Sequence, residues 1–119
     1  MQFKKVEKPW GYFITIWKEE NINIKIIHVN PKSRLSLQSH KFRNELWILL
    51  EGNLTCQIGN KKIKMKKNTA YFIPKKTKHR LCAQKKGGKI LEISFGKFDE
   101  KDIIRYEDDY GRVTKKVGT

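Results

Sequence analysis

The 119-residue sequence predicts an all-β domain. Short runs rich in Ile, Tyr, Phe, Trp and Leu follow one another along the chain, and short polar breaks separate them. Between two of these runs lies Gly59-Asn60, a pair typical of a tight β-hairpin. Many short strands at this spacing indicate a sandwich or a barrel.

We expect strands, in chain order, at Tyr12–Trp17, Asn23–Val29, Arg34–Ser39, Glu45–Glu51, Leu54–Ile58, Lys61–Lys66, Ala70–Ile73, His79–Ala83 and Lys89–Phe95. Pro31-Lys32-Ser33 and Lys86-Gly87-Gly88 predict turns. Asp99 is placed to cap one short helix near Glu100–Ile104. The expected organisation is a single domain over residues 1–119, with its core at 10–98 and a helix and frayed tail at 99–119.

The chain is strongly basic, with a formal net charge of +15. Most of the excess is lysine, and its densest run, Lys61–Lys67, alternates around Ile63 and Met65 as a strand with one solvated face does. No aromatic residues interleave in this run for base stacking. We therefore expect no nucleic-acid partner, although the positive field would attract anionic sugar phosphates.

The sequence contains no apolar run long enough to cross a membrane and no signal peptide, so no membrane partner is expected. Cys56 and Cys82 are the only cysteines, and their spacing suggests no disulfide framework. These features predict a reduced, cytoplasmic protein. Exposed sheet edges, which can pair across a two-fold axis, predict a homodimer.

Candidate metal ligands gather in and after the segment Leu35–Trp47. Gln38 and His40 are two residues apart, so on a strand they face the same side. Glu45 follows them, and His79 lies further along the chain. Imidazole, carboxylate and amide oxygen together suit a divalent metal such as zinc or iron. Spacing alone leaves open a strand with a polar outer face and no metal.

Two stretches resemble the motifs of the cupin superfamily: His40-x-Phe42-x-x-Glu45 followed by six residues and Gly52, and Pro74-x-Lys76-x-x-His79. The sequence departs from the motifs where Phe42 replaces their second histidine, where Asn68 and Lys76 replace glycines, and where Ala83 replaces the last asparagine. The resemblance implies a double-stranded β-helix, which is a small jelly-roll barrel.

A closer resemblance covers nearly the whole chain. Glu7–Gly11, Leu35–Gln38, Arg43-x-Glu45-x-Trp47 and Asp102–Arg112 are similar to the C-terminal domain of type II phosphomannose isomerases, which usually follows a mannose-1-phosphate guanylyltransferase domain. The resemblance implies a stand-alone, metal-dependent isomerase of mannose 6-phosphate and fructose 6-phosphate that works through an enediol. A separate guanylyltransferase is then a candidate partner. The alternative is a non-catalytic or differently specific cupin that binds a phosphosugar or nucleotide sugar.

The resemblance also implies a ligand set. Type I phosphomannose isomerases, which are also cupins, have a Leu-Ser-Ile-Gln-x-His segment whose Gln and His bind zinc, and Leu35–His40 is similar to it. The implied ligands are Gln38, His40, Glu45 and His79. Zn²⁺ is the expected metal, with Mg²⁺, Mn²⁺, Co²⁺ and Fe²⁺ as further candidates. In the alternative, Phe42 fills the barrel and leaves the site empty.

Arg43 is the implied cation for enediolate charge or phosphate. The alternative is a surface arginine paired with Glu51 or Glu92. Lys25 is a candidate base or phosphate contact if it points inward together with Ile27 and Val29.

The reverse parity, with Ile24, Ile26 and His28 inward, stays open from the pattern alone. The family resemblance further implies substrate binding by Lys8, Arg105 and Arg112. The run Asp108–Arg112 is expected to cross the barrel mouth or to form a dimer element.

Overall fold

The structure is a computed structural model, and it describes residues 2–114. Nine strands form one continuous sheet: β1 (Lys5–Lys8), β2 (Gly11–Lys18), β3 (Ile22–Val29), β4 (Leu37–Ser39), β5 (Arg43–Ile58), β6 (Lys61–Lys64), β7 (Ala70–Ile73), β8 (His79–Gly96) and β9 (Ile104–Glu107). The all-β prediction is confirmed. Within residues 2–114 there is no helix of the length and apolarity that a membrane span requires.

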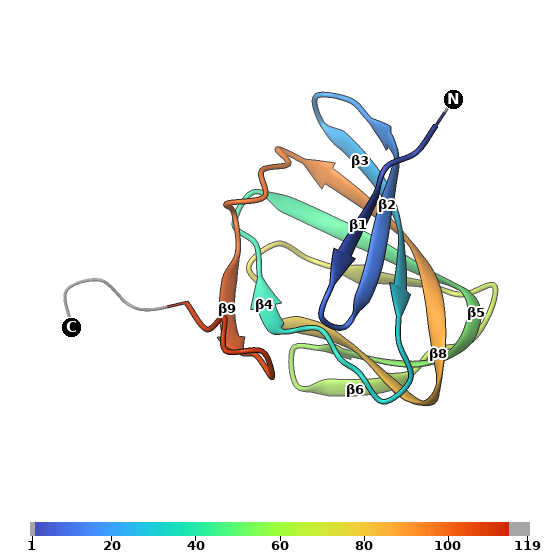
Figure 1. Cartoon of the computed structure of the whole chain (residues 1–119). Coiled ribbons are helices and arrows are strands. Elements are labelled where there is room, and N and C mark those ends of the chain that lie inside the picture. Colours follow the sequence, from blue (N-terminus) through green and yellow to red (C-terminus); the bar gives the residue numbers. More distant parts are fainter. Residues whose placement is uncertain (1, 115–119) are drawn as a thin grey trace.

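Two long, bent strands organise the fold (Figure 1). β5 and β8 pair from Arg43↔Gly96 to Ile58↔His79, and the register shifts between Leu49 and Glu51 and again between Gly52 and Leu54. On the two sides of the bend each strand pairs with different strands, and for β5 these are β7 and β6. The second half of β8 pairs with β3, whereas its first residues lie beside β4.

The bend folds the sheet into two layers. The first layer contains β1, β2, β3, the second half of β8, the first half of β5 and β7. The second layer contains β9, β4, the first half of β8, the second half of β5 and β6. Side chains of both layers meet between them in one apolar core, in which Trp47, Leu54, Ile73, Leu81 and Ile90 are the largest fully buried hydrophobic residues. This is the arrangement of a jelly roll.

Glycine is required where the strands bend. Gly52 has a φ of 85°, and a Cβ there would lie 2.2 Å from the carbonyl oxygen of Gly87. The close approach of the two backbones keeps β8 continuous through Gly87 and Gly88. The turn predicted at Lys86-Gly87-Gly88 is therefore wrong, because these glycines serve a bend within a strand.

Other turn predictions have mixed outcomes. The hairpin at Gly59-Asn60 is confirmed, since Ile58 pairs with Lys61 across it. A turn also forms at Pro31-Lys32. Asn68 and Lys76, which replace motif glycines, adopt φ angles of 60° and 67°, so the chain keeps the left-handed backbone without the glycine.

The short helix predicted near Glu100–Ile104 is wrong. Asp99 accepts a hydrogen bond from the backbone N–H of Lys101 at 2.9 Å, which closes a tight turn instead of capping a helix. The chain then enters β9, which pairs with the otherwise open edge of β4. The frayed tail was predicted at the end of the 99–119 segment, and residues 115–119 lie outside the described part. The last described residue, Thr114, donates its N–H to the carbonyl oxygen of Arg105 at 2.9 Å.

Candidate metal centre and its cavity

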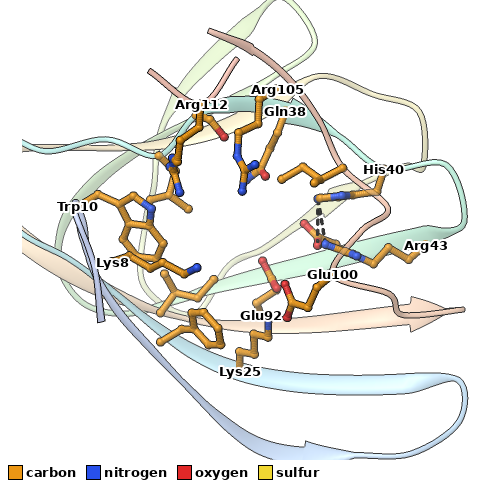
Figure 2. A pocket seen from close by; sticks show the side chains of 16 residues that line it. Lys8, Trp10, Lys25, Gln38, His40, Arg43, Glu92, Glu100, Arg105 and Arg112 are labelled. Carbon is orange, nitrogen blue, oxygen red and sulfur yellow. Dashed lines mark hydrogen bonds and ion pairs between the residues drawn. The ribbon is translucent and has the colours of Figure 1, made fainter. Parts of the chain in front are cut away.

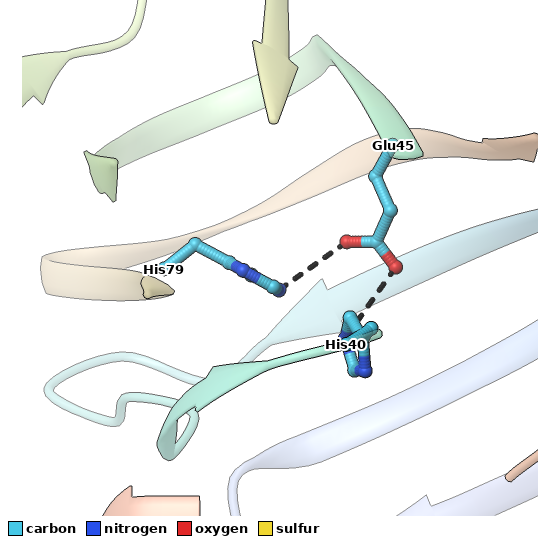
Figure 3. A group of neighbouring side chains, drawn as sticks. All are labelled: His40, Glu45 and His79. Atoms are coloured by element: carbon cyan, nitrogen blue, oxygen red, sulfur yellow. Dashed lines mark ion pairs between the residues drawn. The ribbon is translucent and has the colours of Figure 1, made fainter. Parts of the chain in front are cut away.

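The predicted metal ligands meet where β4, β5 and β8 come together. His40 directly follows β4, Glu45 lies near the start of β5, and His79 is the first residue of β8. Their ligand atoms all lie within 4.8 Å of one another, and all three residues are buried. The carboxylate of Glu45 lies between the two imidazoles (Figure 3). One of its oxygens is 3.7 Å from His40 Nε2, and the other is 3.3 Å from His79 Nε2.

Both imidazoles are oriented by their other ring nitrogen. His40 Nδ1 lies 2.7 Å from the carbonyl oxygen of Asp102, and His79 Nδ1 lies 2.9 Å from that of Thr77. A carbonyl only accepts, so each Nδ1 must carry the proton when the ring is neutral, and each Nε2 keeps its lone pair. Metal-binding histidines are commonly held in this way.

Unpaired polar atoms inside the cluster also fit a cation. Glu45 Oε1 and His79 Nε2 are buried, and neither has a hydrogen-bond partner of acceptable geometry among the described residues. Buried polar atoms normally have partners, and a divalent ion would supply one here. The three side chains therefore suit a divalent metal, which would be held by two imidazoles and one carboxylate.

Burial and charge set the protonation states of the cluster. Burial, together with the nearby Arg43 and His79, lowers the pKa of His40 to about 4, so this ring is neutral at pH 7. Although burial opposes it, the Glu45 carboxylate raises the pKa of His79. The same pairing, with the charges of His40 and Arg43, outweighs burial and holds the pKa of Glu45 well below its usual range.

Arg43 is part of the cluster and not a surface residue. Its side chain is buried, and Nε donates to Glu45 Oε2 at 3.1 Å. Nη2 lies 3.1 Å from His40 Nε2, so the guanidinium donates to the lone pair that a metal would use. The ring of Phe98 stacks against it at 4.4 Å. The alternative pairing of Arg43 with Glu51 or Glu92 is not observed.

One cavity joins this cluster to the other candidate residues (Figure 2). It is lined by all of the predicted catalytic and substrate-binding side chains and by three of the four predicted ligands: Lys8, Lys25, Gln38, His40, Arg43, Glu45, Arg105 and Arg112. His79 does not line the cavity and reaches the cluster through its contact with Glu45. The first layer contributes Lys8, Lys25, Arg43 and Glu45, whereas β4 and β9 of the second contribute Gln38 and Arg105.

The strand parity of Lys25 is now settled. Asn23, Lys25, Ile27 and Val29 are buried in β3, while the residues between them are half-exposed. Lys25 Nζ donates to Glu100 at 3.0 Å and lies over the ring of Phe13 at 4.1 Å. The reverse parity is therefore wrong.

Gln38 shares the cavity with His40, as their spacing predicts. Figure 2 shows its side chain near Arg105, on the opposite side of the cavity from Lys25. No side-chain hydrogen bond of Gln38 is found within residues 2–114. Its role as a fourth metal ligand stays a prediction.

The end of the cavity away from His40 and Glu45 is cationic, and it contains Lys8, Arg105 and Arg112 (Figure 2). Asp108 orients Arg112 through contacts of 2.8 and 3.2 Å. Arg105 Nε is buried without a partner among the described residues. Burial is the main cause that lowers the pKa of Arg105, and the positive charge of the nearby Arg112 lowers it further, because both disfavour the charged guanidinium. An anion at this end would relieve both effects.

Sequence reasoning missed Glu92, which is buried in the cavity beside Lys25 on the neighbouring strand. Trp47 donates to its carboxylate at 3.1 Å. Burial and the charge of Glu45 raise the pKa of Glu92 to about 7, although Lys25, Arg43 and Trp47 oppose them. The sequence does contain a signal for Glu92. It lies two residues after Ile90 in the predicted strand Lys89–Phe95, so the two side chains share the inward face.

Phe42 does not fill the barrel. Asp102 accepts hydrogen bonds from the backbone N–H groups of Lys41 and Phe42 at 2.8 and 3.0 Å, which fixes the connection between β4 and β5. The Phe42 ring then points outward and is 60% exposed. The alternative in which Phe42 fills the barrel is therefore not observed.

Two relatives are similar to almost the whole chain. The xanthan biosynthesis protein XanB of Xanthomonas campestris pv. campestris is 36% identical over 114 residues, which cover 92% of this chain and 24% of that protein. A mannose-1-phosphate guanylyltransferase of Escherichia coli is 32% identical over 113 residues, with the same 92% and 24% coverage. This chain thus spans about a quarter of the length of these relatives, at 24%.

The cupin fold is confirmed by a solved structure. The cupin domain of Cnp3 from Schizosaccharomyces pombe superposes with a TM-score of 0.67 and 14% identity, covering 71% of this chain and 64% of that one. The family described as mannose-6-phosphate isomerase, C-terminal, matches residues 1–108. Because this match takes in both layers and the whole cavity wall up to β9, the chain belongs to the mannose-6-phosphate isomerase C-terminal family.

Proposed function

We propose that the protein is a metal-dependent isomerase that interconverts mannose 6-phosphate and fructose 6-phosphate. The observation that carries the proposal is the polarity of the cavity. One end is lined by His40 and Glu45 of the buried His40–Glu45–His79 cluster, and the other end is lined by the cations Lys8, Arg105 and Arg112. A phosphosugar has the matching polarity, with hydroxyl and carbonyl oxygens at C1 and C2 and a dianionic phosphate at C6.

The cationic end would bind the phosphate. Arg112 is held in place by Asp108, and Arg105 has an N–H without a partner, so both guanidinium groups are prepared to donate to phosphate oxygens. Binding there would direct C1 and C2 toward Glu92, Lys25 and Arg43. The family name, mannose-6-phosphate isomerase, supports this choice of sugar.

Proton transfer between C2 and C1 needs a group that is a base in one step and an acid in the next. Glu92 suits this role, because its carboxyl lies in the cavity and has a pKa of about 7. It would take the proton from C2 of the aldose and return it to C1 of the enediol. Arg43 and Lys25 would supply the positive charge that the developing enediolate oxygen requires.

The metal would be held by His40, Glu45 and His79, with Gln38 as the proposed fourth ligand. When bound, a divalent ion such as zinc would act as a Lewis acid on the sugar oxygens. Before that can happen, the guanidinium of Arg43 must give up its hydrogen bond to His40 Nε2. We propose that Arg43 then turns toward the substrate.

The same hydrogen bond favours a second candidate, a binding domain without catalysis. If Arg43 stays hydrogen-bonded to the lone pair of His40 Nε2, no metal binds there. The cavity then remains a cationic binding site for a phosphosugar or nucleotide sugar. The relatives named mannose-1-phosphate guanylyltransferase are about four times as long, since the match covers 24% of one such protein. A separate guanylyltransferase is a proposed partner in either case.

A coupled isomerase assay separates the two candidates. Protein stripped with a chelator should be inactive, and zinc, cobalt, manganese or magnesium should restore conversion of mannose 6-phosphate. Calorimetry with mannose 6-phosphate, fructose 6-phosphate and GDP-mannose should be run on the same samples. Sugar-phosphate binding without turnover under every metal would leave the binding domain as the function.

A further inference from the structure

One outer face of the molecule is apolar. In the first layer, a row of outward side chains crosses five strands at matched register, and it runs through Phe72, Leu46, Ile93, Ile24 and Trp17. The two ends of the row are open, because Phe72 is 53% exposed and Trp17 is 51% exposed. The three aliphatic side chains between them are half-buried.

A second row lies parallel to the first, two residues further along the strands. It runs through Ile48, Leu91, Ile26 and Ile14, which are paired across four strands and are all half-buried. Phe95 flanks the first row on the other side and is 39% exposed. These two rows with Phe95 are called the apolar face below.

The other outer face of the same fold is different. Over the second layer, the outward groove is lined by seven polar or charged residues, Arg34, Thr55, Gln57, Lys62, Arg80, Gln84 and Glu107, and by Leu37 and Cys82. The strands β5 and β8 contribute to both outer faces. The apolar face therefore belongs to one layer and is not a general property of this sequence.

We propose that the apolar face is the contact surface of a homodimer, in which it packs against the same face of a second copy of the chain. Charge favours this occupant. The chain has a formal net charge of +15, so two copies repel each other wherever lysines face one another. Neither row contains a charged residue. An acidic partner would instead select the lysine-rich surfaces.

The size of the apolar face agrees with a dimer contact. Strands lie about 4.8 Å apart and alternate residues about 6.8 Å apart, so the face covers on the order of 500 Å². Two copies would then bury on the order of 1,000 Å², which is the scale at which specific interfaces begin.

The arrangement of the apolar face is also self-complementary. A two-fold axis that lies in the face and passes through Ile93 places the first row of one copy on the first row of the other. Both ends of that row are aromatic, namely Phe72 and Trp17. Whether the axis runs along or across the strands, aromatic ends meet aromatic ends and aliphatic centres meet aliphatic centres.

Trp17 reports on this contact without any substitution. Trp10 and Trp47 are 6% and 1% exposed, so acrylamide should quench mainly Trp17. Quenching should be strong in nanomolar protein and weaken as the concentration rises through the dimer dissociation constant. Over the same range, sedimentation should move from 14.1 kDa to twice that mass.

Ile93→Lys should weaken the dimer by about 100-fold or more, because a charge would be buried at the centre of the contact. Thr55→Lys is the matched control, since Thr55 is a half-buried outward residue of β5 in the polar groove, and it should leave the dimer intact. Phe72→Lys, on the exposed end of the row, repeats the test where folding is not at risk. Circular dichroism confirms the fold of each variant.

A wild-type protein that is monomeric at micromolar concentration would overturn the proposal. So would a folded Ile93→Lys or Phe72→Lys variant that dimerises as tightly as the wild type, because the contact would then lie at the strand edges. Co-sedimentation of monomers with phosphatidylserine vesicles, lost in Phe72→Lys but kept in Thr55→Lys, would assign the face to a membrane and equally refute the dimer.

Discussion

Trp47 donates its indole N–H to the Glu92 carboxylate across the β5–β8 pair, at 3.1 Å. This bond favours the ionised form of a carboxyl that burial otherwise disfavours. Trp47→Phe should therefore raise the pKa of Glu92 above its value of about 7. If Glu92 acts as the base, the acid limb of the kcat/KM profile should move to higher pH. Trp17→Phe, on the outer face, should leave the profile in place.

Glu92 should also make stability depend on pH. Its pKa is raised from 4.5 to about 7, so it favours the folded state fully below pH 4.5 and loses that contribution as pH rises toward 7. Glu92→Gln should gain stability relative to the wild type over this window, by on the order of 3 kcal/mol. Urea unfolding of both metal-free proteins at pH 4.5 and pH 8 measures the difference. An equal difference at both pH values would contradict the burial of an ionisable Glu92.

Metal binding should depend on His79 and not on His28. His79→Ala removes one of two imidazoles and should lower divalent-metal content from one ion per chain to nearly none. His28→Ala is the control, because His28 stacks on Tyr12 at 4.8 Å on the outer side of β3, away from the cluster. Elemental analysis of protein purified without chelator gives the content. An equal metal content in the two variants would contradict metal binding at the His40–Glu45–His79 cluster.

Arg43 should matter through its geometry and not only through its charge. Arg43→Lys keeps the positive charge but loses the planar group that contacts Glu45, His40 and the Asp99 carbonyl oxygen. Turnover should fall by about 100-fold or more. Arg34→Lys is the control, since Arg34 pairs with Asp109 outside the cavity. Full activity in Arg43→Lys would exclude Arg43 from the reaction.

The phosphate end should be visible in substrate selectivity. Arg105→Gln should raise KM for mannose 6-phosphate about tenfold or more, because it removes a charge-assisted donor. Arg34→Gln serves as the matched control. Weak activity on unphosphorylated mannose should be unchanged by Arg105→Gln. A proportional loss on both sugars would place Arg105 outside phosphate recognition.

Sequence spacing predicted the parts of the site that lie on regular strands. Gln38 and His40 share a cavity because strand side chains alternate, and Glu45 joins His40 and His79 as the motif implies. The parity of Lys25 could not be chosen, because β3 reads apolar on both faces: Ile27 is inward and Ile26 outward.

The remaining failures have a common physical cause. A helix was predicted near Glu100–Ile104 because Asp99 suits a cap, yet the chain forms a tight turn there and then enters β9 along the open edge of β4. Glu92 was not singled out because burial and the neighbouring Glu45 give it its unusual pKa. Both depend on contacts between segments far apart in the sequence, which local patterns do not encode.

The apolar face and the cavity are the two sides of the same strands. Ile24 precedes Lys25, Leu46 follows Glu45, and Ile93 follows Glu92, with each pair pointing in opposite directions. A slip of one residue in strand pairing would exchange the two sets, so that carboxylates and a lysine would face solvent and aliphatic side chains would fill the cavity. Correct folding of either side thus guarantees the other, and misregistered chains would lose metal uptake and the apolar face at the same time.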